Sequence, residues 1–575
     1  MLLTFSIPIN SVASINNPSN SYVLIRSSSS LTLGKLGIIV IFDALNVSNL
    51  ELVNTPNIDY LISNGKAFLD ATTVLPSATT SAHAAMVTGA PPEINGVVHT
   101  YAYNATEYHE SLIDEPISSY GYMDMLRVKT LPEVVKESGG KVALIISKSK
   151  LQLMAGQSKS ADKIIILPND IIGAGDPHEP SYPLEKRFKC MKWITNETLK
   201  TIEEFYQFIA MGSSALIIAH YAEPDWIQGA LGTRHPDTLQ LIEFLDEQLG
   251  RILNKLNELN LWSRTLLVLA ADHGFVDVDE KKNLLSYDYT HLNAIHKEHI
   301  ISETAGLLLY IYLKDPNDTQ SVVNELWNYP WTYHIWTRYP SENTNGTLAD
   351  IGLNIDYAGD IVLDIKPPYY ASRYSGVGAH GGTATQKIPI IFAGGLLKST
   401  TIEEKVTIMH IGPTMAKFFG TTLPNASYAP LDLIAPMADI SLGVYPGIAE
   451  PGSSILVEMN YTISEAISSA NATVIVYDVN GSKIYEDSTV ISNINGSIEF
   501  SFVIIEEGSY TIYGILKDNE GKLLGGKTVS LLVIATEKPP YPWGKVLGAL
   551  LITLIFSGIL IVFPYYWRER KIESS

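Results

Sequence analysis

The sequence predicts an α/β fold: a doubly wound sheet with helices on both faces, followed by a small all-β sandwich and a C-terminal transmembrane helix. Three observations support this prediction. Apolar runs alternate with helical patterns across residues 35–440, alternating apolar and polar residues fill 450–536, and an uncharged apolar segment lies near the end. Strands that alternate with helices favour a largely parallel sheet with helices on both sides. A chain of 575 residues is also long enough for two folded units.

The first unit is built on apolar runs that are typical of buried parallel strands. These runs are LGIIVIFDAL (36–45), KVALIISK (141–148), SALIIAHYAEPD (214–225), TLLVLAADHG (265–274) and IPIIFAGG (388–395). Residues 235–259 repeat apolar side chains at three- and four-residue spacing, which predicts an amphipathic helix. Three runs carry an acid at or near the carboxyl end, namely Asp43, Asp225 and Asp272. Open α/β sheets bind ligands at this edge, so these acids predict a functional site.

The segments on either side of this unit differ from it in pattern. Residues 450–536 alternate apolar and polar side chains between NG and EG turn signals, which predicts a β-sandwich that serves as a stalk or binds a ligand. Residues 1–34 are rich in Ser and Asn and are predicted to be a leader and linker. No Lys or Arg precedes the apolar stretch of the leader, so a cleaved export signal and a shortened start both stay open.

Residues 543–567 are predicted to form a transmembrane helix. The core of this segment, 546–563, has no charged residue, and Trp543 and Trp567 flank it as interfacial side chains. A buried core helix is the alternative, and the terminal position and the all-round apolar surface disfavour it. The basic tail at 568–575 predicts a cytoplasmic C-terminus on the cell membrane, with everything before the helix outside the cell.

The composition narrows the chemistry that the protein can perform. A formal net charge of −20 argues against a nucleic-acid partner, because nucleic acids attract basic surfaces. The single cysteine, Cys190, excludes both an intramolecular disulfide and a cysteine-based zinc cluster. An acidic protein repels phosphate esters unless its site supplies positive charge. Bound metal ions are therefore an attractive source of that charge for any phosphate chemistry in this chain.

Five short stretches combine residue types that bind metal ions. They are VIFDAL with Asp43, LPSATTSAHAAMVTG with Thr79, HYAEPDWIQG with Asp225, AADHGF with Asp272 and His273, and GVGAHGG with His380. Zinc takes carboxylate oxygens and imidazole nitrogens, and two such ions need about six donors. Three carboxylates, two imidazoles and one hydroxyl supply that number, so the stretches together predict a two-metal site.

In this order, the five stretches resemble the alkaline phosphatase superfamily, specifically its type I phosphodiesterase/nucleotide pyrophosphatase family. The resemblance implies an alkaline-phosphatase-like catalytic domain at 35–440 with a cap at about 276–376. The implied ligands of one zinc ion are Asp43, Thr79, Asp272 and His273, and those of the second are Asp225 and His380. Thr79 is then also the nucleophile, because a bound metal lowers the pKa of its hydroxyl. The implied activity is hydrolysis of a phosphodiester or pyrophosphate bond in a small molecule or a headgroup, through a phosphothreonine intermediate.

Two positions depart from the family pattern. The family has a histidine ligand four residues after the acid of the EPD motif, where this chain has Gly229, so we expect a weakened second site. Gln228 and His235 are candidate replacements, although both residue types are more often structural. The nucleotide pyrophosphatase branch also has an Asn three residues after the nucleophile, where this chain has Ala82. Losing such a donor to the phosphate can cost roughly a hundredfold in rate.

Each candidate residue also has an ordinary structural interpretation. Asp43 and the hydroxyls around Thr79 can cap helices, and we assign His83 to helix packing. The adjacent Asp272 and His273 are harder to explain in this way, because a buried acid–imidazole pair requires partners. The joint occurrence of the five stretches in order favours the metal site.

Other functions stay open alongside hydrolysis. The same intermediate can transfer its phosphoryl group to a lipid or glycan headgroup, and a catalytically decayed envelope receptor can keep the fold. The Cys/Ser-x-Pro-x-Arg signal of a sulfatase is absent around Thr79. The cap contains several aromatic residues that either shape a leaving-group pocket or, more commonly, form its hydrophobic core. They are Trp327, Trp331, Tyr333, Trp336 and Tyr339.

Overall fold

The computed structural model describes residues 34–110, 118–285, 299–372, 376–398, 401–434, 438–463, 469–479, 482–519, 521 and 523–535. The predicted leader, transmembrane helix at 543–567 and tail at 568–575 lie outside these residues, apart from Gly34. Within the described ranges, no helix is both long and apolar enough to cross a membrane. Contacts divide the chain into a unit at 31–435 and a unit that includes the residues from 436 onward.

A mixed sheet forms the centre of the unit at 31–435, with the strand order β2-β15-β8-β1-β7-β5-β6. The strands are β1 (Leu36–Phe42), β2 (Lys66–Thr72), β5 (Lys141–Ile146), β6 (Lys163–Ile166), β7 (Ala215–Tyr221), β8 (Thr265–Ala270) and β15 (Lys387–Ala393). β1 pairs in parallel with β7 and β8, and β5 pairs in parallel with β6 and β7. The alternation of strands and helices thus correctly predicted the α/β class.

The direction of β15 was predicted wrongly. The apolar run at 388–395 was expected to be parallel, but β15 is antiparallel to both β2 and β8. The chain comes to β15 directly from β14 (Gly378–Ala379) and His380, which lie at the carboxyl edge of the parallel strands. It therefore enters the sheet from that edge and runs against its neighbours. An apolar run records burial on both faces, and it carries no information about direction.

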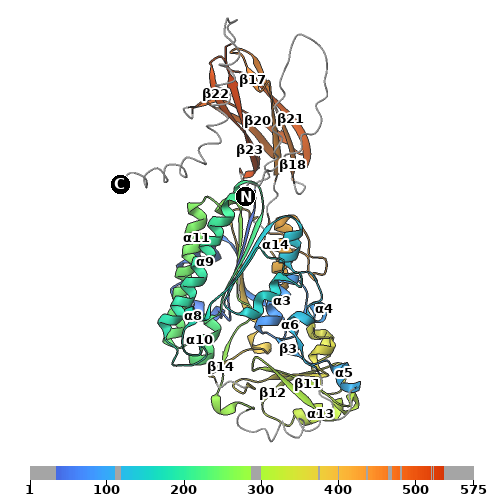
Figure 1. Cartoon of the computed structure of the whole chain (residues 1–575). Helices are drawn as coiled ribbons and strands as arrows, with labels where there is room; N and C mark the ends of the chain where they lie inside the picture. Colours follow the sequence, from blue (N-terminus) through green and yellow to red (C-terminus); the bar gives the residue numbers. More distant parts are fainter. Residues whose placement is uncertain are drawn as a thin grey trace, which may run out of the picture. The chain divides into compact units, whose positions relative to one another are not determined.

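Helices cover both faces of this sheet, so β1 is buried along its whole length. Figure 1 shows α9 and α11 on one side of the sheet and α3 and α14 on the other. The described helices of this unit are α1 (Val47–Leu50), α2 (Pro56–Asn64), α3 (Thr79–Thr88), α4 (Pro92–Asn95), α5 (Ala105–Glu110), α6 (Tyr122–Met125), α7 (Leu131–Glu137), α8 (Asn169–Ile172), α9 (Leu184–Ala210), α10 (Glu223–Leu231), α11 (Pro236–Glu258), α13 (Thr319–Leu326) and α14 (Ile411–Phe419). α14 packs directly on β1 at Gly37, where a Cβ atom would lie 2.6 Å from the Phe419 ring.

The amphipathic helix expected at 235–259 is confirmed as α11. Its N-terminus is set by His235, whose Nδ1 accepts a hydrogen bond from the Asp237 N–H, and by Pro236 in the first helical position. Leu241, Leu245 and other apolar residues on one face are buried. The burial of this face packs α11 against α9.

The cap contains a small antiparallel sheet of its own, in the order β10-β11-β13-β12. The elements are β10 (Ile300–Thr304), β11 (Leu308–Tyr312), β12 (Thr332–Thr337) and β13 (Ile361–Ile365), with α13 on one face. Of the five cap aromatics, Trp331 and Trp336 are buried, and Trp331 belongs to the apolar core of the cap. Trp327, Tyr333 and Tyr339 are 40%, 41% and 66% exposed, so the five aromatics do not act as one group.

The second unit is a β-sandwich. One sheet has the order β16-β18-β21 and the other β17-β23-β22-β19-β20. The strands are β16 (Ala438–Tyr445), β17 (Ile448–Ala449), β18 (Ser454–Ile463), β19 (Ala470–Tyr477), β20 (Lys483–Ile491), β21 (Asn495–Val503), β22 (Gly508–Asp518) and β23 (Leu523–Val533). Alternate residues such as Val457, Met459, Val474 and Ile512 are fully buried between the sheets. β16 and β17 precede residue 450, the start expected from the alternating pattern.

Candidate functional site

The site lies where the parallel strands end. Asp43 follows β1, Asp272 and His273 follow β8, and Asp225 lies in the first turn of α10, just after β7. β1 lies between β7 and β8 in the sheet, so neighbouring strands bring these residues together. Thr79 and His380 reach the same place from the start of α3 and the turn after β14.

Asp43, Asp272 and His273 form one group of close donors. The His273 Nδ1 lies 3.0 Å from the Gly274 carbonyl oxygen, and the Nε2 lies 3.3 Å from Asp43 Oδ1 and 3.5 Å from Asp272 Oδ2. Asp272 Oδ1 accepts hydrogen bonds from the backbone N–H groups of Ala44 and His273. The opposite oxygen of Asp272 therefore faces His273.

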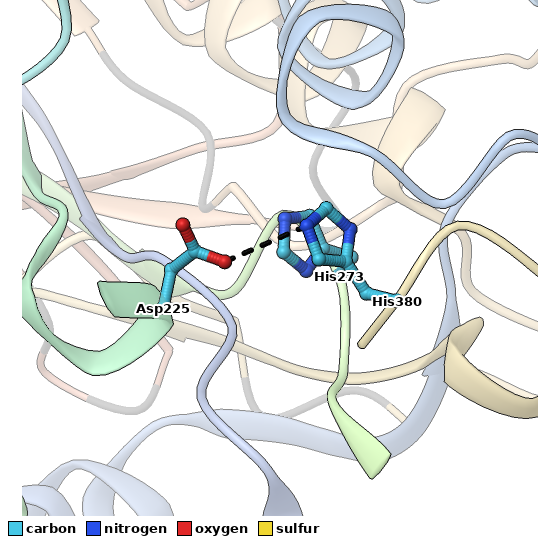
Figure 2. Close-up of side chains that lie close together, drawn as sticks. All are labelled: Asp225, His273 and His380. Carbon is cyan, nitrogen blue, oxygen red and sulfur yellow. Dashed lines mark ion pairs between the residues drawn. The ribbon is translucent and has the colours of Figure 1, made fainter. Parts of the chain in front are cut away.

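Asp225, His273 and His380 form a second group. The His380 Nε2 is 3.5 Å from Asp225 Oδ1, and its Nδ1 lies 2.9 Å from the Ser77 carbonyl oxygen. The imidazole rings of His273 and His380 stack at 3.7 Å with an angle of 6° between them. Figure 2 shows Asp225 pointing towards this stacked pair. In each of the two groups, one donor atom per residue lies within 4.8 Å of the others.

Thr79 lies beside both groups. Its side-chain oxygen is 3.5 Å from His273 Nε2 and 3.4 Å from the Lys148 ammonium. The residue is 2% exposed and is the first residue of α3, where backbone N–H groups have no acceptor within the helix. The hydroxyl therefore lies beside a positive charge, at the N-terminus of α3.

These residues fit divalent cations. Within the described residues, Asp43 Oδ1 and Asp272 Oδ2 are buried and have no hydrogen-bond partner. Leaving carboxylate oxygens buried and unpartnered is costly, and a metal ion removes that cost. Carboxylate and imidazole donors are those that zinc takes in proteins. The donor set therefore suits the two ions that the sequence predicted.

The electrostatics of the buried groups agree with this fit. Burial, followed by the negative charge of Asp43, raises the pKa of Asp272 well above its ordinary value. Burial opposes ionisation of Asp43, but Lys148 and His220 hold its pKa well below the usual range. Burial lowers the pKa of His273, and it lowers that of His380 to about 3. Both imidazoles are thus neutral at physiological pH, the form that binds metal.

Lys148 is the main site residue that the sequence analysis missed. Its ammonium lies 2.6 Å from Asp43 Oδ2 and 2.7 Å from Asp225 Oδ2, so it links the two groups. Burial alone would lower the pKa of Lys148, but the carboxylates of Asp225 and Asp43 raise it, and the side chain stays charged. Its position just after β5, at the same sheet edge as the three acids, was the available signal.

Two further histidines, His220 and His83, contact the carboxylates of Asp43 and Asp272. The His220 Nε2 lies 3.0 Å from Asp43 Oδ2, a contact that the sequence analysis did not anticipate. His83, which we assigned to packing, is fully buried in α3. Its Nδ1 lies 2.7 Å from the Thr79 carbonyl oxygen and 3.5 Å from Asp272 Oδ2. Such outer partners orient metal ligands.

The suggested replacements for the missing histidine are engaged elsewhere. The Gln228 side-chain N–H groups donate to the Ala44 and Pro224 carbonyl oxygens, and its Oε1 accepts from Asn46. His235 caps α11. Gly229 lies one turn after Asp225 in α10, and a Cβ atom there would have only Phe275, at 3.8 Å, as a close neighbour. Neither candidate belongs to the two groups of donors found in the described part of the chain.

Known proteins resemble this chain in sequence and in fold. The human ectonucleotide pyrophosphatase/phosphodiesterase family member 7 is 22% identical over 251 residues, which cover 42% of this chain and 48% of the relative. The chain thus spans about half the length of that curated relative. The alkaline phosphatase PafA superimposes with a TM-score of 0.54 and 14% identity, over 70% of this chain and 99% of that protein.

A second structure supports the same fold. The murine ectonucleotide pyrophosphatase/phosphodiesterase 5, an inactive form in complex with AMP, has a TM-score of 0.50 and 16% identity. It covers 68% of this chain and 96% of its own. Residues 38–384, more than half of the chain, match the family described as type I phosphodiesterase/nucleotide pyrophosphatase. The chain belongs to the type I phosphodiesterase/nucleotide pyrophosphatase family, as the five stretches of its sequence predicted.

Proposed function

We propose that the protein hydrolyses phosphate esters with Thr79 as the nucleophile and two divalent cations, expected to be zinc, as cofactors. The observation that carries the proposal is the position of the Thr79 oxygen, 3.5 Å from His273 and 3.4 Å from Lys148. His273 belongs to both groups of metal donors. A nucleophile at the junction of two such groups is suited to in-line displacement at phosphorus.

The residues divide the chemical work among them. Asp43, Asp272 and His273 would hold one cation together with Thr79, and Asp225 and His380 would hold the second. When bound, the cations would acidify the threonine hydroxyl, neutralise the phosphate and stabilise the leaving oxygen. Thr79 attacks phosphorus, the bond to the leaving oxygen breaks, and water then hydrolyses the phosphothreonine. The N–H groups in the first turn of α3 would be available to phosphate oxygens beside Thr79.

Lys148 and Lys150 favour a second candidate, a preference for phosphomonoesters. The Lys148 ammonium is within 3.4 Å of the attacking oxygen, where a terminal phosphate would lie. Burial, with the charge of Lys148, lowers the pKa of Lys150 to about 8, so this side chain is still largely cationic at neutral pH. A terminal monoester carries more negative charge than a diester and gains more from two nearby cations. For the murine relative, the bound AMP is itself such a monoester.

The cellular setting is part of the proposal. The uncharged segment at 546–563 and the basic tail support a single-pass anchor in the cell membrane, with the catalytic unit outside the cell. The substrate would then be a small phosphate ester or a headgroup at the membrane surface. Transfer of the phosphoryl group to a headgroup alcohol, and a decayed receptor without turnover, are the alternatives.

Turnover of aryl phosphomonoesters and diesters by purified protein, with zinc or a chelator, tests the proposal. Thr79→Ala should lose roughly 10³-fold or more in kcat, as nucleophile removal does in other hydrolases. Thr80→Ala is the matched control, because the Thr80 hydroxyl bonds Thr100 and should leave the rate nearly unchanged. Acid-quenched protein should carry a phosphoryl group on Thr79. Wild-type turnover by Thr79→Ala would refute the mechanism, and a phosphorylated added alcohol would indicate the transferase.

A further inference from the structure

The turn that carries His380 is attached to the cap. The His380 N–H donates to the Ala305 carbonyl oxygen at 3.2 Å, and its own carbonyl oxygen accepts from the Leu307 N–H at 2.9 Å. Ala305 and Gly306 join β10 to β11, and both have positive φ angles, 51° and 103°. The backbone of a candidate metal ligand is therefore hydrogen-bonded to the cap sheet rather than to the central sheet.

Asp364 attaches the same turn from a second direction. This residue of β13 is fully buried. One of its carboxylate oxygens accepts the Thr383 N–H at 3.2 Å, and the other accepts the Thr383 hydroxyl and lies 2.8 Å from His334 Nδ1. Thr383 lies three residues after His380. A Cβ atom at Gly382 would lie 2.2 Å from the same carboxylate, so only glycine allows this close approach.

We propose that Asp364 is a positioning residue for the second metal site, and that it acts through Thr383 on the turn that holds His380. This inference rests on the proposed two-metal function. Hydrogen bonds to a carboxylate are stronger than neutral ones, and Asp364 makes them where water is excluded. They hold the Thr383 end of the turn, while Ser77 donates to the Gly381 and Gly382 carbonyl oxygens at 2.9 and 2.8 Å and its own carbonyl oxygen holds the imidazole by its Nδ1. In this orientation the Nε2 lies 3.5 Å from Asp225 Oδ1.

The second metal site is where such support has the largest effect. The family histidine is absent at Gly229, so Asp225 and His380 are the donors that the described residues offer to this site alone, and the third residue of the group, His273, is shared with the first site. With few ligands, the binding of an ion depends strongly on how well each one is oriented. Loss of a residue that orients metal ligands typically lowers metal affinity by roughly 10- to 100-fold. The cap thereby supports the metal site, in addition to any part it has in covering the substrate.

The cap provides a matched control. Asp360, the residue before β13, is also buried, and it accepts the Leu313 N–H at 2.8 Å and lies 3.1 Å from His109 Nε2. It thus resembles Asp364 as a buried carboxylate with a histidine and a backbone N–H, and it also pairs with Arg338 at 3.4 Å. Its partners belong to the cap and α5, away from the turn with His380.

The test is an equilibrium Zn²⁺ titration of the full-length protein and its variants, with unfolding curves recorded in parallel. Asp225→Asn identifies the second site by the binding step that it removes. Asp364→Leu and Thr383→Val should weaken that step by roughly 10- to 100-fold and leave the other step within about twofold. Thr383→Ser and Asp360→Leu should both bind zinc in the second step as tightly as wild type does.

The outcomes separate the two proposals. If Asp364→Leu and Thr383→Val bind zinc in the second step as tightly as wild type, or no more weakly than Asp360→Leu, the positioning role of Asp364 is refuted. If Asp364→Leu fails to fold, Thr383→Val against Thr383→Ser decides the question alone, because Thr383→Val removes the hydroxyl that bonds Asp364 and Thr383→Ser keeps it. If wild type shows no binding step that Asp225→Asn removes, the two-metal function itself fails.

Discussion

Replacing Lys148 with methionine should increase the affinity of the protein for zinc. The ammonium occupies Asp43 Oδ2 and Asp225 Oδ2 at 2.6 and 2.7 Å, one carboxylate from each group of metal donors. A cation that binds either carboxylate competes with Lys148 for the same negative charge. Methionine has a similar length and no charge, so the variant has no such competitor.

The size of the effect follows from the contacts that are lost. A hydrogen bond between charged groups is worth about 1.5–3 kcal/mol, so releasing one of them should tighten zinc binding roughly 10- to 100-fold. The metal-free variant should be less stable, because removing one partner from a buried ion pair costs about 3–5 kcal/mol. Zinc should restore that stability, since the ions neutralise the same carboxylates.

Competition with a chromophoric chelator measures the zinc affinity, and urea unfolding with and without zinc measures the stability. Lys136→Met is the control, because Lys136 pairs with Asp162 at a partly exposed position away from the site. That variant should bind zinc as wild type does. If Lys148→Met binds zinc no more tightly than Lys136→Met, the ammonium does not compete with the cations, and this interpretation of the site is wrong.

Two further predictions concern α10. Gly229→His restores the family ligand at a position with room for a side chain, so Zn²⁺ titration should show the second ion bound at least tenfold more tightly, and Gly229→Ala should show no such gain. Burial raises the pKa of Glu223 from 4.5 to about 8, so between these values the folded protein holds a proton that the unfolded chain releases, and stability falls as the pH rises. Glu223→Gln removes this dependence. Between about pH 5 and about pH 8, the free energy of unfolding of the variant, measured with urea, should rise by a few kcal/mol relative to that of wild type. If the difference between the two proteins does not change with pH, the pKa of Glu223 is not raised.

The sequence predicted those features that depend on local pattern. Apolar runs ending in acids predicted the sheet and the edge that carries the site, because burial and strand polarity place Asp43, Asp225 and Asp272 together. The direction of β15 could not be predicted, since an antiparallel buried strand has the same composition as a parallel one. Lys148 was missed for a related reason. A lysine after a strand is usually solvated, and only the fold shows that it lies between two carboxylates.

The two departures from the family pattern gain a common explanation once Lys148 is considered. Gly229 removes a neutral metal ligand, and Ala82 removes an uncharged hydrogen-bond donor to the phosphate. Lys148 adds a positive charge between the two groups of metal donors, within reach of Thr79. A mobile ammonium can balance the carboxylates before an ion binds and can then turn to the phosphate, which a fixed amide cannot do. In the proposed function the nucleophile and six of the metal donors thus match the family pattern, while the groups that would meet the phosphate do not. The choice between monoester and diester substrates should therefore be decided by the charge around Thr79, and the family name alone is not a guide to it.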